Sequence, residues 1–510
     1  MRSSFALAAF AALTLVTSGA SSIWAADSDD GNWANWRGPN YDGSSMVAKP
    51  PVEWSEEKNI VWKVEVPGKG SASPVIWGDK LFLLTAVPVE GAEDAKPMED
   101  GPMGPPAGDR EPLRPLNPPD APPRLGPGDR PGAPGGPQRP EGEARPRGPR
   151  GPGQGGPGRG GPGGGRGGFG RGEAPTTPFD FTVICFDKKT GEKLWSQVAI
   201  QAVPHESGHN TNTFASGSAV TNGKLLIAFF GSRGVYCYDL DGNLKWKKDL
   251  GKQQTRNAFG EGSTPALYED TLIVPWDHEG DSYVMALNAN TGEELWKVPR
   301  DEPTTWSTPI VTEFQGTTQV ILNGSPMVRS YDVKTGSLLW ECSGQAANPI
   351  ATPIIYDGKA ICMTGYRGYA VYSINLDAKG DVSKSDDAIA WSRSDVGPYI
   401  ASATLLNDRL YVTKSRDGVI YCLDAKTGET IYGPERLPEA STLYSSLVGA
   451  DGKVYVCDRD GTTVVLDGGP EFKVLATNQL DEGIDASPAL IGSQIFIRGD
   501  KHLYCIEQAK

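Results

Sequence analysis

The sequence lacks the features that most often mark a reactive site. Its 510 residues include seven cysteines and four histidines, and no two cysteines are adjacent. No spacing of cysteine and histidine matches a zinc site, and neither a glycine-rich phosphate loop nor a nucleophile elbow is present. From motifs alone we therefore predict no metal site and assign no catalytic residue.

Positive charge is scarce relative to negative charge. Lys and Arg total 49 against 63 Asp and Glu, which gives a formal net charge of −14. This balance argues against general binding of nucleic acid or of anionic membranes by the body of the protein. We expect a monomer that binds a protein partner or an anionic small molecule, and we expect no nucleic-acid partner.

Long apolar runs are absent beyond the N-terminus, so no internal segment is expected to span a membrane as a helix. A short apolar run from Phe5 to Val16 follows Arg2, and "SIWAAD" offers small residues for cleavage near Ala26. We predict a signal peptide over 1–26 and export to the periplasm or the medium. No cysteine lies near the cleavage site, so attachment of a lipid is not indicated.

One internal stretch, residues 88–178, is dominated by Pro, Gly and Arg. Such a composition buries no core, so we predict a disordered insert in the loop of the first repeat. Its basic residues suggest an alternative, a flexible arm for anionic polymers. We favour the plain solvated insert, because an exported chain rarely meets nucleic acid.

A short motif recurs along the rest of the chain, for example "CFDKKTGEKLW" at 185–195 and "SYDVKTGSLLW" at 330–340. Its copies are spaced by about 40 to 50 residues, the length of one four-stranded propeller blade. We therefore predict an all-β, eight-bladed β-propeller of four-stranded antiparallel blades. The eight anchoring residues are Asp187, Asp239, Asn288, Asp332, Asn375, Asp424, Asp467 and Glu507.

Each copy contains the parts of a blade. Alternating apolar residues broken by "NG" or "DG" predict a meander of hairpins. The anchoring carboxylate or amide is expected to bond its own downstream backbone, and the Trp about eight residues later to pack on the neighbouring blade. Small residues in "GSTP" (262–265) and "WSTP" (306–309) suit an inner strand beside a central channel.

The last copy begins at Ile484 and contains neither an outer strand nor a Trp. The strand-like "NIVWKVEVPG" at 59–68, with Trp62, stands alone before the first inner strand. We predict that it completes the last blade and closes a propeller over 59–510, preceded by an N-terminal extension over 27–58. Closure removes the free edges of an open array.

Four cysteines occupy the same position of the repeat, where other copies carry Ala, Ser or Val. Such a position is a small buried slot, and equivalent positions of different blades lie too far apart for a disulfide. We predict free, packed thiols. The four are Cys185, Cys237, Cys422 and Cys505.

One face of the propeller is expected to collect arginines, because the turns between second and third strands share a face with the links between blades. The links on this face add His209, Trp306, Tyr399 and Tyr444. We predict an anion-binding mouth, since guanidinium groups bind carboxylate or phosphate bidentately. The simpler alternative is that each arginine pairs with a nearby carboxylate such as Asp417 and stiffens its turn. The candidate residues in the turns are Arg233, Arg329, Arg367, Arg416, Arg459 and Arg498, with Trp276, Asp277, His278 and Glu279 in the third blade.

The repeat resembles the tryptophan-docking motif A-x-D-x-x-T-G-x-x-x-W of the bacterial PQQ-like propellers. That family includes quinoprotein alcohol dehydrogenases and the lipoprotein scaffold of the outer-membrane barrel assembly machinery. "NWANWRGPNYDGSS" at 32–45 also resembles the start of exported PQQ-like repeat proteins. The resemblance implies two functions. The first is an exported non-catalytic propeller that binds a partner or anionic ligand on its arginine-bearing face.

The second implied function is a PQQ-dependent alcohol or sugar dehydrogenase that would hold PQQ with Ca²⁺ in the central mouth. Against it, the dehydrogenases use an adjacent Cys–Cys disulfide that this sequence lacks, and their calcium ligands cannot be matched here. Asp277 is only a candidate for their catalytic Asp. His278 and Glu279 could also serve as an acid–base pair or metal ligands, but no third ligand follows at a recognisable spacing. We favour the non-catalytic function and assign no cofactor.

Overall fold

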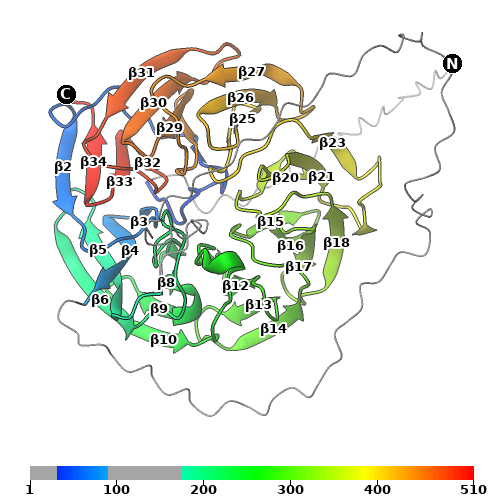
Figure 1. Cartoon of the computed structure of the whole chain (residues 1–510), viewed down its shortest axis with the longest axis horizontal. Coiled ribbons are helices and arrows are strands. Elements are labelled where there is room, and N and C mark those ends of the chain that lie inside the picture. Colours follow the sequence, from blue (N-terminus) through cyan, green and yellow to red (C-terminus); the bar gives the residue numbers. More distant parts are fainter. Residues whose placement is uncertain (1–30, 90–173, 510) are drawn as a thin grey trace, which may run out of the picture. The chain divides into compact units, whose positions relative to one another are not determined.

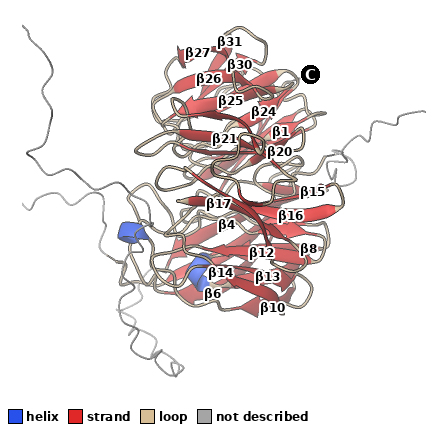
Figure 2. Cartoon of the chain, turned by 90° about the vertical axis from the view of Figure 1, so that its right-hand side faces the viewer, coloured by secondary structure: helices blue, strands red, loops and turns tan. Residues whose placement is uncertain are grey.

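The computed structural model describes residues 31–89 and 174–509, and these form a ring of eight sheets around a central channel (Figure 1). Each sheet is built on four antiparallel strands that run from the channel outward, as predicted for an eight-bladed propeller. Figure 2 shows the same blades from the side, with almost no helix. The predicted signal peptide (1–26) lies outside the described residues, as does the predicted insert (88–178) apart from its two ends.

The first four blades are listed from the inner to the outer strand. Blade 1 contains β3 (Val75–Trp77), β4 (Lys80–Pro88), β5 (Phe179–Asp187) and β6 (Lys193–Ala202). Blade 2 contains β7 (Val220–Thr221), β8 (Leu225–Phe229), β9 (Val235–Asp239) and β10 (Leu244–Lys248). Blade 3 contains β11 (Ala266–Tyr268), β12 (Thr271–Trp276), β13 (Tyr283–Asn288) and β14 (Glu294–Pro299). Blade 4 contains β15 (Ile310–Phe314), β16 (Thr317–Leu322), β17 (Met327–Asp332) and β18 (Leu338–Ser343).

The remaining blades follow the same plan. Blade 5 contains β19 (Ile354–Tyr356), β20 (Lys359–Thr364), β21 (Ala370–Asn375) and β23 (Ile389–Arg393). Blade 6 contains β24 (Thr404–Leu406), β25 (Arg409–Lys414), β26 (Val419–Asp424) and β27 (Thr430–Arg436). Blade 7 contains β28 (Val448–Ala450), β29 (Lys453–Cys457), β30 (Thr462–Asp467) and β31 (Val474–Gln479). Blade 8 contains β32 (Ala489–Ile491), β33 (Gln494–Arg498), β34 (His502–Glu507) and β2 (Ile60–Glu65), and two short 3₁₀ helices, η1 (Gly231–Arg233) and η2 (Arg256–Ala258), lie in loops.

The ring closes through blade 8, which combines both parts of the chain. Strand β2 pairs antiparallel with β34, and Trp62 stands opposite Cys505. This confirms that a strand from the N-terminal part completes the last blade. A β-ladder therefore holds the ring shut, and neither end of the array is left as an open edge.

Tryptophan docking links most neighbouring blades, as expected. In each case the indole Nε1 donates to a backbone carbonyl of the next blade, one residue after that blade's anchor, at 2.8–3.2 Å. Trp62, for example, lies against Gly191, where φ is +74° and an added Cβ would sit 2.8 Å from the indole. The anchor Asp187 accepts the backbone N–H of Lys189 and Thr190, which shapes that turn. The docked residues are Trp62, Trp195, Trp246, Trp296 and Trp391.

Trp340 departs from this pattern because the next blade lacks the Thr-Gly turn. Its Nε1 donates to Gln319 in its own blade at 3.1 Å, and its side chain is fully buried. The longer turn of blade 5 instead supplies β22 (Gly380–Asp381), which pairs parallel with β18. Blade 4 thus has its outer edge covered by a strand from blade 5.

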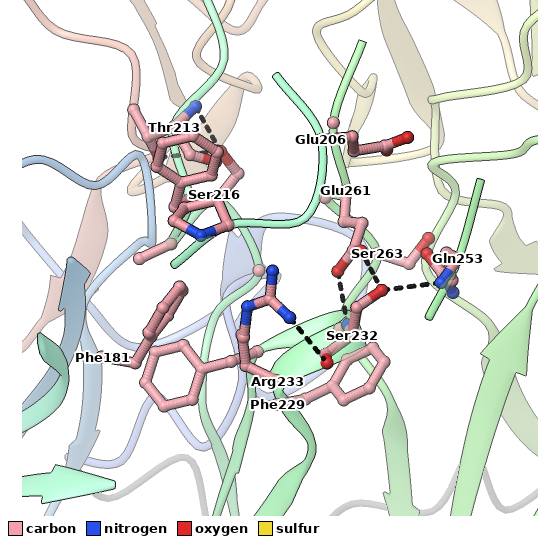
Figure 3. Close-up of a pocket in the computed structure, with 18 of the residues that line it drawn as sticks. Phe181, Glu206, Thr213, Ser216, Phe229, Ser232, Arg233, Gln253, Glu261 and Ser263 are labelled. Carbon is pink, nitrogen blue, oxygen red and sulfur yellow. Dashed lines mark hydrogen bonds between the residues drawn. The ribbon is translucent and has the colours of Figure 1, made fainter. Parts of the chain in front are cut away.

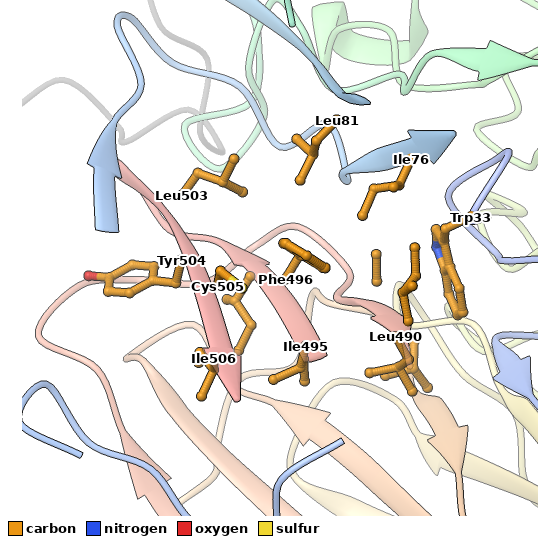
Figure 4. Packing of buried hydrophobic residues seen from close by; sticks show 14 of the residues in the cluster. Trp33, Ile76, Leu81, Leu490, Ile495, Phe496, Leu503, Tyr504, Cys505 and Ile506 are labelled. Atoms are coloured by element: carbon orange, nitrogen blue, oxygen red, sulfur yellow. The ribbon is translucent and has the colours of Figure 1, made fainter. Parts of the chain in front are cut away.

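The hydrophobic core lies between adjacent blades. Figure 4 shows the cluster around blades 1 and 8, where Ile76, Leu81 and Phe496 are fully buried beside Trp33. All seven cysteines are free and buried, which confirms the prediction of packed thiols. Burial raises the pKa of the Cys185 thiol to about 12, so it stays protonated and unreactive at neutral pH.

An N-terminal segment, residues 33–45, crosses one end of the channel, and we call it the N-terminal plug. Trp33 pairs with Ile76 of blade 1, and strand β1 (Ser44–Ser45) pairs parallel with β28 of blade 7. Its most tightly held residue is Arg37, which is fully buried and donates to the carbonyls of Ala403 and Leu447 between blades 6 and 7. The sequence predicted this stretch only as part of an extension, because nothing local shows which carbonyls a single arginine will meet.

Candidate functional site

A cavity of about 640 Å³ occupies the centre of the ring. Its wall is formed by the residues that precede the inner strands and by the turns and links on one face of the propeller. At the opposite end Trp36 of the N-terminal plug lines the cavity and donates its Nε1 to Thr308 at 3.2 Å. The channel is therefore a one-ended pocket, with the plug as its floor and an open mouth on the other face.

The wall near the mouth is aromatic. Tyr366 and Tyr399 stack with ring centroids 4.7 Å apart, and Tyr444 lines the same side. The Trp306 indole, which also lines the cavity, donates to the carbonyl of Gly260 at 2.7 Å, which fixes its orientation. These half-buried rings offer flat apolar surfaces to a small molecule.

Cationic groups stand at the mouth beside the aromatic rings. Arg416 is exposed and donates to the Tyr444 hydroxyl at 3.0 Å, and no carboxylate within the described ranges forms an ion pair with it. Arg459 pairs with Asp485 at 2.7 Å and lies over the Tyr444 ring. Burial raises the pKa of Asp485 to about 6, although Arg459 opposes the shift.

His209 completes the mouth on the side of blade 2. Its Nδ1 is 2.7 Å from the Thr211 hydroxyl, and its ring meets Phe259 edge-on. Burial lowers the pKa of His209, and the positive charges of Arg416 and Arg459 lower it further. The ring is therefore neutral at pH 7, and Arg416 is the side chain whose positive charge faces the cavity without a carboxylate partner in the described part of the chain.

The other predicted arginines do not reach this cavity. Arg329 pairs with Asp301, Glu302 and Glu341 between blades 3 and 4. Arg498 is buried and donates to the carbonyls of Ala72 and Leu84. Both side chains tie neighbouring blades together. Arg329 does so by pairing with carboxylates, although not with a turn carboxylate named from the sequence, whereas Arg498 bonds backbone carbonyls instead of a carboxylate.

Arg367 lies on the same face but outside the cavity, exposed above the ring of Tyr366. Its guanidinium centre is 5.3 Å from the ring centroid, so the arginine makes a cation–π contact with Tyr366 and does not line the cavity.

The four residues predicted as a ligand group in the third blade bond or pack against other residues of the propeller. Trp276 is buried in the core between blades 2 and 3. Asp277 forms a buried ion pair with Arg300 at 2.8 Å. His278 accepts the backbone N–H of Gln254, while Glu279 accepts the hydroxyl of Thr304. None of the four lines the central cavity. Trp276 ends strand β12 inside the core, and the other three lie in the turn after it, where Asp277 and His278 are buried and Glu279 is exposed.

A smaller pocket of about 50 Å³ surrounds Arg233 (Figure 3). Arg233 donates to His205 Nδ1 at 3.0 Å, and His205 donates its Nε2–H to the Gln253 carbonyl. Glu261 accepts both the N–H and the hydroxyl of Ser232, and burial raises the pKa of its carboxyl to about 7. The donors and acceptors of this pocket are largely satisfied by one another.

Several residues of the central cavity were missed by sequence reasoning. Trp36 reaches it through the N-terminal plug, and Asn348 lies in a link that carries no motif. Asp485 opens "DASP" (485–488), one copy of the motif of small residues before the inner strands, but it was not predicted as a cavity residue. Tyr366 stood beside a predicted arginine and could have been found as part of the same turn. Within the described ranges no group of three or more His, Cys, Asp or Glu is placed to hold a metal ion. Likewise, no described helix is long and apolar enough to cross a membrane.

The fold and cavity define the class of the protein as a closed eight-bladed β-propeller with a one-ended central pocket. A family model described as outer membrane protein assembly factor BamB matches residues 180–433. This match covers about half of the chain and agrees with the resemblance of its repeat motif to the PQQ-like propellers.

Two similar proteins are both named methanol dehydrogenase [cytochrome c] subunit 1. The one from Methylobacterium organophilum is 24% identical over 309 residues, which cover 52% of this chain and 47% of that protein. The one from Methylorubrum extorquens is 25% identical over 253 residues, which cover 44% of this chain and 38% of that protein. This chain therefore spans about half or less of the length of these relatives.

Among solved structures, the quinohemoprotein alcohol dehydrogenase from Comamonas testosteroni aligns with 94% of this chain and 81% of its own, at a TM-score of 0.57 and 10% identity. At that identity the likeness concerns the fold alone.

Proposed function

We propose that this chain is an exported, non-catalytic propeller that binds a small anionic ligand in its central cavity. The observation that carries the proposal is the one-ended pocket, where Trp306, Tyr399 and Tyr444 present aromatic surface beside Arg416. A flat ring placed against these side chains loses water on both faces, and a carboxylate or phosphate at the mouth meets a free guanidinium. The mouth also suits an inserted side chain of a protein partner.

The alternative is a PQQ-dependent alcohol or sugar dehydrogenase, which the likeness to methanol dehydrogenase favours. PQQ is a planar quinone with several carboxylates and needs Ca²⁺ in that enzyme class. The cavity wall offers the single arginine Arg416 against the carboxylates of Asp417 and Asp485. In the described part of the chain, no three residues among His, Cys, Asp and Glu gather where they could hold the calcium. The donor set therefore does not fit the cofactor, and we derive no step through it.

The test is binding by the mature protein and two matched variants. Arg416→Ala removes the free guanidinium, while Lys426→Ala removes an equal charge from an exposed turn of blade 6 outside the cavity. Calorimetry with a panel of aromatic and sugar carboxylates should find binding that Arg416→Ala weakens about tenfold, since a charge-assisted bond contributes roughly 1.5–3 kcal/mol. Equal affinity of the two variants for every bound acid would contradict the proposal.

The same preparation separates the two candidate functions. Addition of PQQ and Ca²⁺ followed by gel filtration should leave no quinone absorbance with the protein. Retained absorbance together with dye reduction by an alcohol would favour the dehydrogenase.

A further inference from the structure

A ring of hydroxyl groups surrounds the channel just above the N-terminal plug. Each blade carries one Ser or Thr two residues before its inner strand, and all eight are buried. The backbone N–H of one such residue donates to the hydroxyl of the next blade, and seven of the eight links are present at 2.9–3.4 Å. We call this ring the hydroxyl belt. It consists of Ser73, Ser218, Thr264, Thr308, Thr352, Ser402, Ser446 and Ser487.

The bonding within the belt sets the direction of its hydroxyl hydrogens. A hydroxyl has one donor and two acceptor positions. Because a backbone N–H already occupies an acceptor position, the remaining O–H must find an acceptor elsewhere. Thr308 is the extreme case, since it accepts both the N–H of Thr264 and the indole of Trp36.

Six members of the belt also line the central cavity: Ser73, Ser218, Thr264, Thr308, Ser446 and Ser487. Their exposed fractions are 3–6%, and none donates its hydroxyl hydrogen to a protein acceptor within the described ranges. Thr352 and Ser402 belong to the belt but do not line the cavity. The deep end of the pocket therefore presents a circle of O–H donors with unused capacity.

From this geometry we propose that the hydroxyl belt binds the oxyanion group of a ligand at the deep end of the cavity. This inference rests on the proposed function and deepens it, because it names the chemistry of the buried end of the ligand. A carboxylate, phosphate or sulfonate only accepts hydrogen bonds, so several O–H donors can meet it at once. An ammonium or amide N–H could use the second acceptor position of these hydroxyls, except at Thr308, but it would leave their O–H donors without an acceptor.

The charge beneath the floor favours the same choice. The Arg37 guanidinium lies 5.3 Å from the centroid of the Trp36 ring. Burial lowers the pKa of Arg37 to about 10, so the group remains charged at neutral pH. Asp42, which lies beside Arg37, offsets part of that charge. The ligand class that results is a small planar acid with its oxyanion on the belt and its ring against Trp306 and Tyr399.

The test compares variants that each remove one hydrogen bond of the belt but differ in whether the lost hydroxyl lines the cavity. Ser218→Ala and Ser446→Ala each remove a cavity-lining hydroxyl and leave one backbone N–H without an acceptor. Ser402→Ala leaves the N–H of Thr352 without an acceptor in the same way, but removes no cavity-lining hydroxyl. All three should lower the Tm by similar amounts.

Benzoate, benzenesulfonate and the neutral benzamide serve as probes, with affinity measured by calorimetry. Ser218→Ala and Ser446→Ala should each weaken both anions about tenfold relative to Ser402→Ala, and change benzamide little. Equal affinities across the three variants, or no binding of either anion, would overturn the inference and would mean that water alone fills the belt.

A crystal structure with benzoate distinguishes this inference from the proposed function. A carboxylate on the belt hydroxyls supports both. A carboxylate held at Arg416 alone overturns the belt as an anion site and leaves the proposed function standing. An empty cavity in that crystal, with no loss of binding in Arg416→Ala, contradicts both.

Discussion

The two ends of the central channel are built from the same repeated blades but differ in how their polar groups are used. At the floor, Arg37 is fully buried, and its two terminal nitrogens donate to the carbonyls of Asp42 in the plug and of Ala403 and Leu447 in two neighbouring blades. At the mouth, Arg416 is exposed, and its guanidinium bonds the Tyr444 hydroxyl and no carboxylate of the described residues. A buried arginine whose terminal nitrogens are held by backbone carbonyls stabilises a fold, whereas an exposed arginine beside a cavity can meet a ligand.

The difference also shows how a propeller acquires a pocket. A ring of blades leaves a channel open at two ends, and here the N-terminal plug closes one of them with Trp36. A ligand can then enter from one side only, and it is held between a polar floor and an aromatic wall. The comparison suggests four experiments, ordered by the size of the expected effect.

The largest effect is expected at the floor. Arg37→Met should lower the free energy of unfolding by about 3 to 5 kcal/mol, because buried carbonyls of Asp42, Ala403 and Leu447 lose their donor. Lys49→Met, at an exposed position just after the plug, is the matched control and should change stability by about 0.5 kcal/mol or less. Denaturant unfolding measures both, and equal destabilisation would show that the floor is not held by Arg37.

At the mouth, Tyr399→Ala should act on binding more than on stability. It removes the ring that stacks on Tyr366, and benzoate should bind about tenfold more weakly, since an aromatic contact contributes roughly 0.5–1.5 kcal/mol beyond its buried area. Tyr369→Ala removes a half-buried ring that contacts Lys414 but does not line the cavity. Calorimetry should find its affinity unchanged, and a loss equal to that of Tyr399→Ala would contradict the aromatic wall.

A smaller effect is expected from pH at the mouth. Burial raises the pKa of Asp485 from its ordinary value to about 6, which means that the folded protein holds this proton more tightly than the unfolded chain does. The stabilisation of the folded state by the protonated carboxyl is therefore fully present below about pH 4 and is lost as the pH rises through 6. In the same window the negative charge beside Arg459 disappears as the pH falls. Benzenesulfonate, which stays ionised, should therefore bind a few-fold more tightly at pH 5 than at pH 7.

Asp485→Asn is the control for this prediction. It should bind benzenesulfonate at pH 7 as tightly as the wild type does at pH 5, and its affinity should hardly vary between the two. A variant that keeps the full pH dependence would point instead to another titrating group at the mouth, such as His209.

The smallest effect is expected for Arg367→Ala. This arginine was predicted as a ligand group, yet it lies outside the cavity and above Tyr366. Both the affinity for benzoate and the free energy of unfolding should stay within about 0.5 kcal/mol of the wild type. A tenfold loss of affinity would extend the binding surface beyond the cavity wall.

Much of the fold could be predicted because the repeat is written into the sequence. The side chain of Asp187 accepts backbone N–H groups of its own turn, Gly191 has a positive φ, and Trp62 docks on that turn. Each residue type follows from a contact within the repeat, and most copies around the ring make the same contact. The missing outer strand of the last copy similarly pointed to β2. Free cysteines followed from the small slot that they share with Ala, Ser and Val.

The candidate site was predicted less well. The position of a turn in the repeat predicts the face of the propeller on which an arginine lies. The direction of its side chain depends on the residues around it, and these decide whether the guanidinium faces the channel or pairs with a carboxylate. Arg416 lines the cavity and Arg459 contacts two of its lining residues, Asp485 and Tyr444. Arg329 and Arg498 instead lie in the interfaces between blades. Trp276 likewise pointed into a core.

By itself the sequence determined the number of blades, the docking of tryptophans and the closure of the ring, because these depend on contacts that repeat at a fixed spacing. Only the tertiary structure decided that the channel has a floor, which hydroxyls encircle it and which arginine keeps free donors. Those outcomes depend on single contacts between residues hundreds of positions apart, such as Arg37 with Leu447. No local pattern encodes such a contact, because it exists only after the ring has closed.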